Sequence, residues 1–164
     1  MKPEMSKITT GIVNVLKKIV MVLLAIATVV VALQIIMRYV VGHPLSWSEQ
    51  LARFIFIWMM MLAIPIMFYG RTYLCFDLLL GALPKNLHDW IQLLIDILML
   101  IFCVYNLYNS ANLILHTKPT LKTAGVQVPQ VFMYSSLCIS MFLSSIVMGD
   151  HLRLSIRKCF KKEG

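Results

Sequence analysis

The sequence predicts an all-α integral membrane protein with four transmembrane helices, and two observations carry that prediction. Of the 164 residues, 60% are hydrophobic and 13% are charged, whereas soluble domains carry about 25% charged residues. The apolar residues also gather in stretches of roughly 20, which is the length that crosses a bilayer. Because this length allows one compact unit, residues 1–164 are expected to form a single membrane domain.

The first predicted span covers about residues 15–40. No charged residue lies between Ile19 and Met37, Lys17 and Lys18 precede this stretch, and Arg38 follows it. The stretch is longer than the apolar part of a signal peptide, and no small-residue cleavage site follows. A retained transmembrane helix is therefore expected.

The second predicted span covers about residues 47–70 and has a clear start signal. Ser46-Trp47-Ser48-Glu49 is a capping box, in which the serine accepts from a backbone N–H and the glutamate reaches back. Pro65 lies inside this stretch and removes one backbone hydrogen bond, so a kink is expected, which membrane helices tolerate.

The second half of the chain predicts two further spans and one short surface helix. Residues 71–83 are too short and too charged to cross, so we expect an interfacial helix on the cytoplasmic side, ended by Leu83-Pro84. The third span is expected at about 90–115, in a helix that begins near Asn86. The fourth is expected at about 129–149, with Pro129 in the first turn and a helix end near Gly149.

The distribution of basic residues predicts that both termini lie in the cytoplasm. With that orientation, four Lys or Arg fall in the N-terminal segment, two in the middle loop and five after Gly149, which makes eleven inside. The outer loops then hold four. Short cytoplasmic loops carry the excess of Lys and Arg, so this asymmetry favours the orientation.

Several functional classes are not supported by the sequence. The net charge of +8 comes from residues at chain ends and span edges, which is not the basic stripe of a nucleic-acid-binding protein. The four cysteines form no C-x-x-C pair, and the four histidines lie outside the expected spans, so no metal site, haem or other cofactor is predicted. No nucleotide loop or catalytic motif is present, and no enzyme activity is expected.

The sharpest polar cluster lies at the outer edge of the first two spans. Glu49 and Arg53 are four residues apart and share a helix face, while Arg38 and Trp47 lie nearby in the sequence. A charge about two turns inside a span is expensive and usually paired. The cluster predicts either an interfacial anchor with a structural ion pair, or a contact with a partner subunit or lipid headgroup.

Two polar features inside the later spans point to helix packing. Asp96 lies early in the apolar part of the third helix, where it favours interhelical hydrogen bonding over a substrate or ion pathway. Ser136, Ser140 and Ser144 follow one another at spacing four, which places small residues on one helix face and lets two helices approach closely. The chain also lacks two interrupted helices in matched halves, which favours an accessory subunit over a complete carrier.

The chain resembles the small membrane subunit (DctQ- and SiaQ-like) of tripartite ATP-independent periplasmic (TRAP) transporters. The resemblance is carried first by the run from Arg38 to Arg53, RYVVGHPLSWSEQLAR, and continues to Trp58. It returns at Leu74-Cys75-Phe76-Asp77, at Leu83-Pro84 and from Gly125 to Tyr134. The chain departs from the family where Gln50 follows Glu49, since the family often has two glutamates, and at Tyr73, where it often has histidine.

This resemblance implies a function in uptake across the bacterial inner membrane. Such a subunit pairs with a large multi-spanning permease subunit, and a periplasmic binding protein delivers an organic acid of the sialic acid or C4-dicarboxylate type. A sodium gradient drives transport, and the substrate and sodium sites belong to the large subunit. The small subunit is then a scaffold, whose outer loops are expected to help dock the binding protein. Subunit or lipid contacts are expected at Arg38, Trp47, Glu49, Arg53, Asp77, Asp96, Ser136, Ser140 and Ser144.

Two other functional classes fit the same residues. One is a self-sufficient small transporter that works as a homo-oligomer. The other is the membrane anchor subunit of a redox complex. Co-purification distinguishes the three classes, because the chain would bring with it a large permease, only copies of itself, or a coloured cofactor.

Overall fold

The computed structural model describes residues 5–42, 46–70, 85–116 and 131–161, and every regular element within them is helical. The helices are α1 (Lys7–Ile36), the π-helical turn η1 (Met37–Val41) that continues it, α2 (Ser46–Gly70), α4 (Lys85–His116) and α5 (Val131–Lys161). Four of these stretches are long and apolar enough to cross a membrane. The predicted all-α fold with four apolar helices is therefore confirmed for the described residues.

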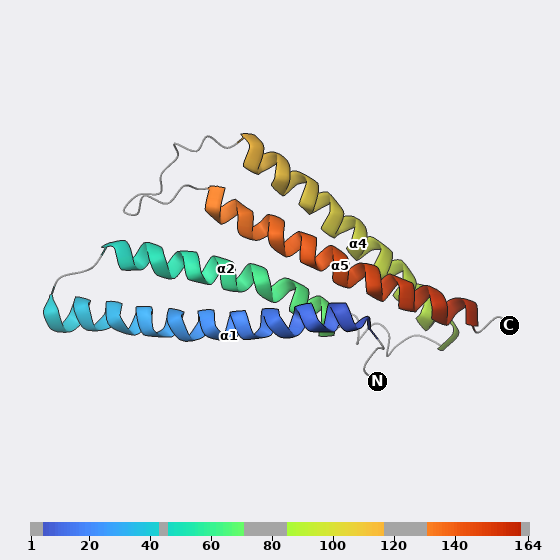
Figure 1. Ribbon diagram of the computed structural model, residues 1–164, viewed down its shortest axis with the longest axis horizontal. Coiled ribbons are helices and arrows are strands. Elements are labelled where there is room, and N and C mark those ends of the chain that lie inside the picture. The colour runs from blue at the N-terminus through green and yellow to red at the C-terminus, as the bar shows by residue number, and fades with distance from the viewer. Residues whose placement is uncertain (1–4, 43–45, 71–84, 117–130, 162–164) are drawn as a thin grey trace.

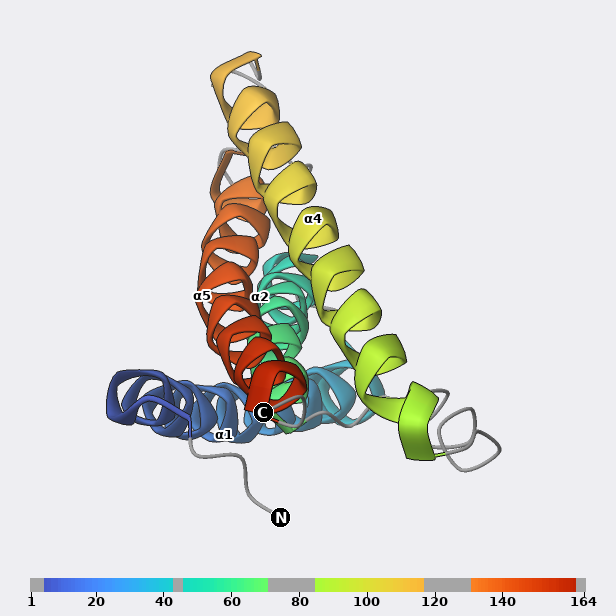
Figure 2. The same ribbon diagram turned by 90° about the vertical axis from the view of Figure 1, so that its right-hand side faces the viewer.

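The four long helices pack in the order α1, α2, α5, α4, so that α2 and α5 lie in the middle (Figure 1). Each helix runs antiparallel to the one it follows in the chain, and the start of α1 and the end of α5 lie at the same end of the bundle. We call this the terminal end, and the opposite one the loop end. Toward the loop end the α1–α2 pair diverges from the α4–α5 pair, and Figure 2 shows α1 crossing beneath the other helices.

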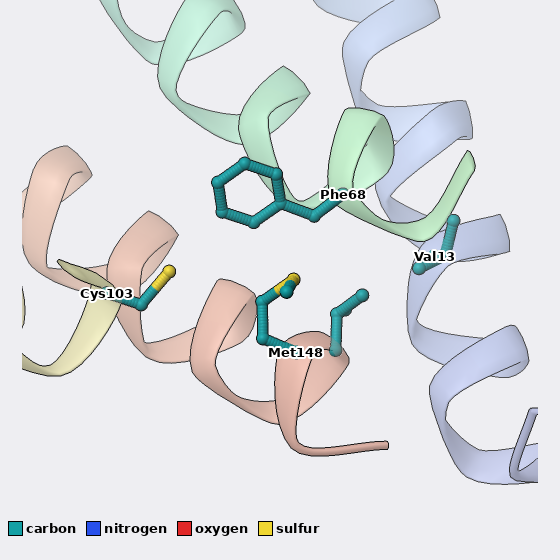
Figure 3. Close-up of a cluster of buried hydrophobic side chains, with 5 residues drawn as sticks. Val13, Phe68, Cys103 and Met148 are labelled. Carbon is teal, nitrogen blue, oxygen red and sulfur yellow. The ribbon is translucent and has the colours of Figure 1, made fainter. Parts of the chain in front are cut away.

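The hydrophobic core lies where all four helices converge. It consists of Val13 from α1, Phe68 from α2, Cys103 from α4, and Val147 and Met148 from α5 (Figure 3). Val13, Cys103, Val147 and Met148 are fully buried. Each helix thus contributes at least one side chain to a single contact point, which fixes the helices relative to one another.

Helix α1 is long but contributes little buried surface. It begins at Lys7, about two turns before the predicted span, and the chain leaves it at Gly42, whose φ of 76° is a left-handed conformation that glycine adopts without strain. Only 6% of its most apolar stretch is buried, against 33% for α5. Most of α1 therefore faces the surroundings of the subunit.

The predicted end of the last helix near Gly149 is wrong, because α5 continues to Lys161. The added turns are amphipathic: His151 and Ser155 are buried, whereas Arg153 and Arg157 are exposed. Burial of one face of these turns stabilises the helix beyond Gly149. The membrane boundary predicted near residue 149 stays a prediction, and so does the cytoplasmic side of both termini.

Two other expectations concern residues that the structure does not describe. The interfacial helix predicted at 71–83, with Asp77, lies outside the described residues, as does Pro129. Helix α2 begins at Ser46, as the capping box predicts, and continues through Pro65 to Gly70.

Candidate functional site

Three small polar side chains lie on one buried face of α5, and one of them contacts α2. Ser136, Ser140 and Ser144 are all fully buried, as four-residue spacing on one face allows. The Ser140 hydroxyl donates to the backbone carbonyl oxygen of Met61 in α2, at 2.5 Å. Ser136 donates to the carbonyl oxygen of Met133 in its own helix, at 2.7 Å. Because serine is small, this face lets the α5 backbone come close enough to α2 for a direct hydrogen bond.

Two further polar contacts join α5 to its neighbours at the terminal end. Asp96 of α4 is 1% exposed, and the Ser155 hydroxyl donates to its Oδ2 at 2.5 Å. The Thr9 hydroxyl of α1 donates to Asp150 of α5, and Thr9 is also buried. Helix α5 is thus tied by side-chain hydrogen bonds to helices on both sides of it.

Sequence reasoning placed Asp96 but missed its partner and the second contact. The sequence gives no expectation for Ser155 or for the buried His151 as packing residues, because it predicts that the helix ends near Gly149. The signal that could have found them is the spacing of Val147, His151 and Ser155, which continues one helix face in steps of four. Thr9 lies ahead of the predicted first span and so was not considered.

The polar cluster at the loop end is only partly assembled within the subunit. Arg53 Nη2 lies 3.5 Å from Glu49 Oε1, and the two side chains are 55% and 74% exposed. The Arg38 guanidinium lies over the ring of its neighbour Tyr39, 5.8 Å from the centroid. The side chain of Trp47 lies outside the described residues. The structure therefore brings Glu49 and Arg53 together on an outer surface, where a partner or a headgroup can reach them.

A wide apolar groove opens between the two helix pairs. Its volume is about 580 Å³, and every residue that lines it is hydrophobic. Leu16 and Leu23 of α1, Phe54 and Trp58 of α2 and Ile139 of α5 are among them. The Trp58 ring packs at 5.1 Å from that of Phe132 in a tilted arrangement. Such a groove suits acyl chains or an apolar helix and offers nothing that would bind an ion or a polar substrate.

A second groove, of about 450 Å³, lies along α4 and α5, and polar side chains border it although most of its exposed lining surface is apolar. Asn106, Asn109 and Asn112 of α4 line it; we call these three residues the asparagine face. Ser110, Leu113 and His116 of α4 and Leu137 of α5 complete the lining. Within the described ranges, no three His, Cys, Asp or Glu side chains gather as a metal site would require.

Comparison with known proteins identifies the family. The sequence profile described as "Tripartite ATP-independent periplasmic transporters, DctQ component" matches residues 27–158, well over half of the chain and part of every helix. The chain belongs to this family. The resemblance seen from Arg38 to Arg53 is thereby confirmed, and the family is a component of a transporter.

Three curated relatives carry related names. An isethionate TRAP transporter permease protein DctMQ from Oleidesulfovibrio alaskensis is 28% identical over 114 residues, which are 69% of this chain and 18% of that protein. A putative TRAP transporter small permease protein from Haemophilus influenzae is 27% identical over 81 residues, 49% of this chain and 50% of that protein. A sialic acid TRAP transporter permease protein SiaT, also from Haemophilus influenzae, is 28% identical over 85 residues, 48% of this chain and 14% of that protein.

The chain thus spans half or less of the length of each of these relatives. Membership of the family and the four apolar helices together make it a multi-pass integral protein of the inner membrane.

Proposed function

We propose that the chain is the small scaffold subunit of a sodium-driven TRAP transporter that takes up organic acids. Its partners are a large multi-spanning permease subunit in the same membrane and a periplasmic substrate-binding protein. The observation that carries this proposal is the family match over residues 27–158, which includes part of all four helices. Surrounding phospholipids are further expected contacts of its apolar faces.

The distribution of polar groups supports a scaffold more than a complete carrier. Two of the buried serines of α5 hydrogen-bond to neighbouring helices: Ser140 donates to α2 and Ser155 to α4. The groove of about 580 Å³ is apolar, and α1 leaves most of its surface outside the bundle. A carrier needs a polar path for its substrate, whereas a scaffold needs rigid helices with free outer faces.

The proposed substrate class rests on the names of the relatives and on the family resemblance, not on the structure. Two of them are named for isethionate and for sialic acid, and both compounds are organic acids. We therefore propose an organic acid, of the sialic acid or C4-dicarboxylate type. In this proposal the substrate and sodium sites belong to the large subunit.

The test is co-expression of the tagged chain with a large permease subunit of its own transporter, followed by affinity purification. We expect the two to purify together and, in proteoliposomes with the binding protein, to take up labelled sialic acid or succinate only with an inward sodium gradient. A potassium gradient is the matched control. Recovery of self-associated chain alone, or of a coloured cofactor, would overturn the proposal in favour of a small homo-oligomeric transporter or a redox anchor. The family match weighs against both of those outcomes.

A further inference from the structure

The asparagine face is unusual because it places three amide side chains along the outer edge of the bundle. Asn106, Asn109 and Asn112 follow one another at spacing three, and α4 is the edge helix on the far side of α5 from α1 and α2 (Figures 1 and 2). Asn109 is exposed, while Asn106 and Asn112 are half-buried. These amides therefore border whatever surrounds the subunit.

Their depth makes that position costly in lipid. The uncharged stretch of α4 extends from Ile97 to Leu115, and Asn106 lies at its midpoint. At about 1.5 Å per residue, Asn109 and Asn112 lie roughly 5 and 9 Å farther along the helix, still inside the stretch. An amide that meets hydrocarbon without a hydrogen-bonding partner loses several kcal/mol relative to water. A lipid-facing edge is therefore a poor explanation for three of them.

The hydrogen bonds of α4 itself do not use the full capacity of these amides. One N–H of Asn106 donates to the carbonyl oxygen of Phe102 in the same helix, at 2.8 Å. An asparagine amide has a second N–H and a carbonyl oxygen with two lone pairs. The groove of about 450 Å³ that the three residues line is open to the surroundings of the subunit, and Leu113 of α4 and Leu137 of α5 add apolar surface to it.

We propose that the asparagine face binds a transmembrane helix of the large permease subunit, one whose facing side carries hydrogen-bonding side chains. This inference rests on the proposed function, since it names where the large subunit docks. Polar complementarity is the first argument: an amide row at membrane depth is matched by Ser, Thr, Asn or Gln on a facing helix. His116, exposed at the end of the same groove, extends the polar row toward the membrane surface.

The relatives favour the large subunit over a second copy of the chain as the occupant. In two of them the matching region is 18% and 14% of a single longer permease protein. In each of these two proteins, the region that matches this chain is part of the same polypeptide as a much larger region. The matching region therefore has that larger region as a partner in a one-to-one ratio. A contact between different proteins does not require the face to be self-complementary, as a twofold dimer would.

The decisive experiment is photo-cross-linking from single positions of α4 in the co-expressed complex. A benzophenone amino acid replaces Asn109 in one variant and Val104 in the control, which is also exposed but lies about 140° away around the helix. We expect an adduct with the large subunit from position 109 and little or none from position 104. An adduct with a second copy of the chain, adducts with lipid alone, or equal yields at the two positions would each overturn the proposal.

Substitution gives an independent measure of the same contact. Asn109→Leu and Asn112→Leu each remove one amide, and interhelical hydrogen bonds of this kind change association by about threefold each. We expect the double variant to recover roughly a tenth of the large subunit, with an unchanged melting temperature of the isolated chain, while Val104→Leu recovers the normal amount. Undiminished recovery with the double variant would overturn the proposal. If the unsubstituted chain recovers no large subunit, the proposed function is wrong. If the unsubstituted chain recovers the large subunit, the variants test only where the contact lies.

Discussion

The terminal end and the loop end of the bundle are built from similarly apolar helices but pack in different ways. At the terminal end, side chains from all four helices meet in one core, and hydrogen bonds join Asp96 to Ser155 and Thr9 to Asp150. Toward the loop end the helix pairs separate and an apolar groove opens between them, while an exposed ion pair lies on the outer surface. The difference shows that hydrophobicity alone does not decide where membrane helices touch.

The physical reason is that lipid is as apolar as the side chains. Burying leucine against leucine gains little in a bilayer, so close contact depends on packing, on small residues and on hydrogen bonds. The terminal end and the α2–α5 contact have serines and short polar links at the helix crossings. The groove at the loop end is lined by large side chains such as Phe54 and Trp58. We infer that the terminal end holds the subunit together, while the loop end stays available to lipid or to a partner.

The first prediction concerns which end of the bundle faces the cytoplasm, and its expected effect is all-or-none. The excess of Lys and Arg predicts that the terminal end lies in the cytoplasm. In a background without the four native cysteines, Thr120→Cys should react with a membrane-impermeant maleimide applied from outside, and Phe160→Cys should not. Labelling at 160 without labelling at 120 would reverse the predicted topology.

The second prediction compares the replacement of methionine by alanine at a buried position and at an exposed position. Met148→Ala opens a cavity in the core and should lower the free energy of unfolding by about 2–5 kcal/mol. Met60→Ala, on an exposed surface of α2 at 68% exposure, should change it by less than about 0.5 kcal/mol. Thermal unfolding in detergent measures both. Similar losses at the two positions would contradict the view that stability is concentrated where the helices converge.

The third prediction tests the contact between α5 and α2. Ser140→Leu forces a larger side chain into a fully buried position and removes the hydrogen bond to Met61, so we expect a loss of about 1–3 kcal/mol. Ser140→Ala removes only the hydrogen bond and should cost about 0.6 kcal/mol. Phe142→Leu, on the exposed side of the same helix, is the control. Equal and negligible effects of all three would remove the close-packing role of the serine face.

The sequence was sufficient to locate four apolar helices, but not the end of the last one or the contacts between them. Uncharged stretches such as Ile19 to Met37 identify a span because lipid excludes charge, and the capping box at Ser46 locates a helix start. The order of packing is not visible in such stretches, because apolar residues occur on all sides of each helix. The polar contact of Thr9 with Asp150 joins residues 141 apart in the chain, and no local pattern points to it. Asp96 and the serines could be recognised as packing residues, whereas their partners could not be named.

The fourth prediction concerns the ion pair of Glu49 and Arg53, where the smallest effect on the isolated subunit is expected. Both side chains are mostly exposed, and exposed ion pairs contribute about 0–1 kcal/mol. Glu49→Ala or Arg53→Ala should therefore hardly change the melting temperature of the chain alone. We nevertheless propose that both variants recover less of the large subunit and show less uptake, with the same substrate preference, because a partner that covers the pair would strand the remaining charge. The exchanged variant, Glu49→Arg with Arg53→Glu, keeps a pair and serves as the control.

The combination of readouts decides what the loop end does. Loss of assembly together with uptake in the single variants, and partial recovery in the exchanged one, would place a subunit contact at the pair. If assembly persists while uptake is lost, the pair acts in transport or in docking the binding protein, and a scaffold function at this position is wrong. If neither changes, Glu49 and Arg53 are an interfacial anchor, in keeping with their exposure. In that last case the contact with the large subunit must lie elsewhere, and the asparagine face of α4 would be the next surface to substitute.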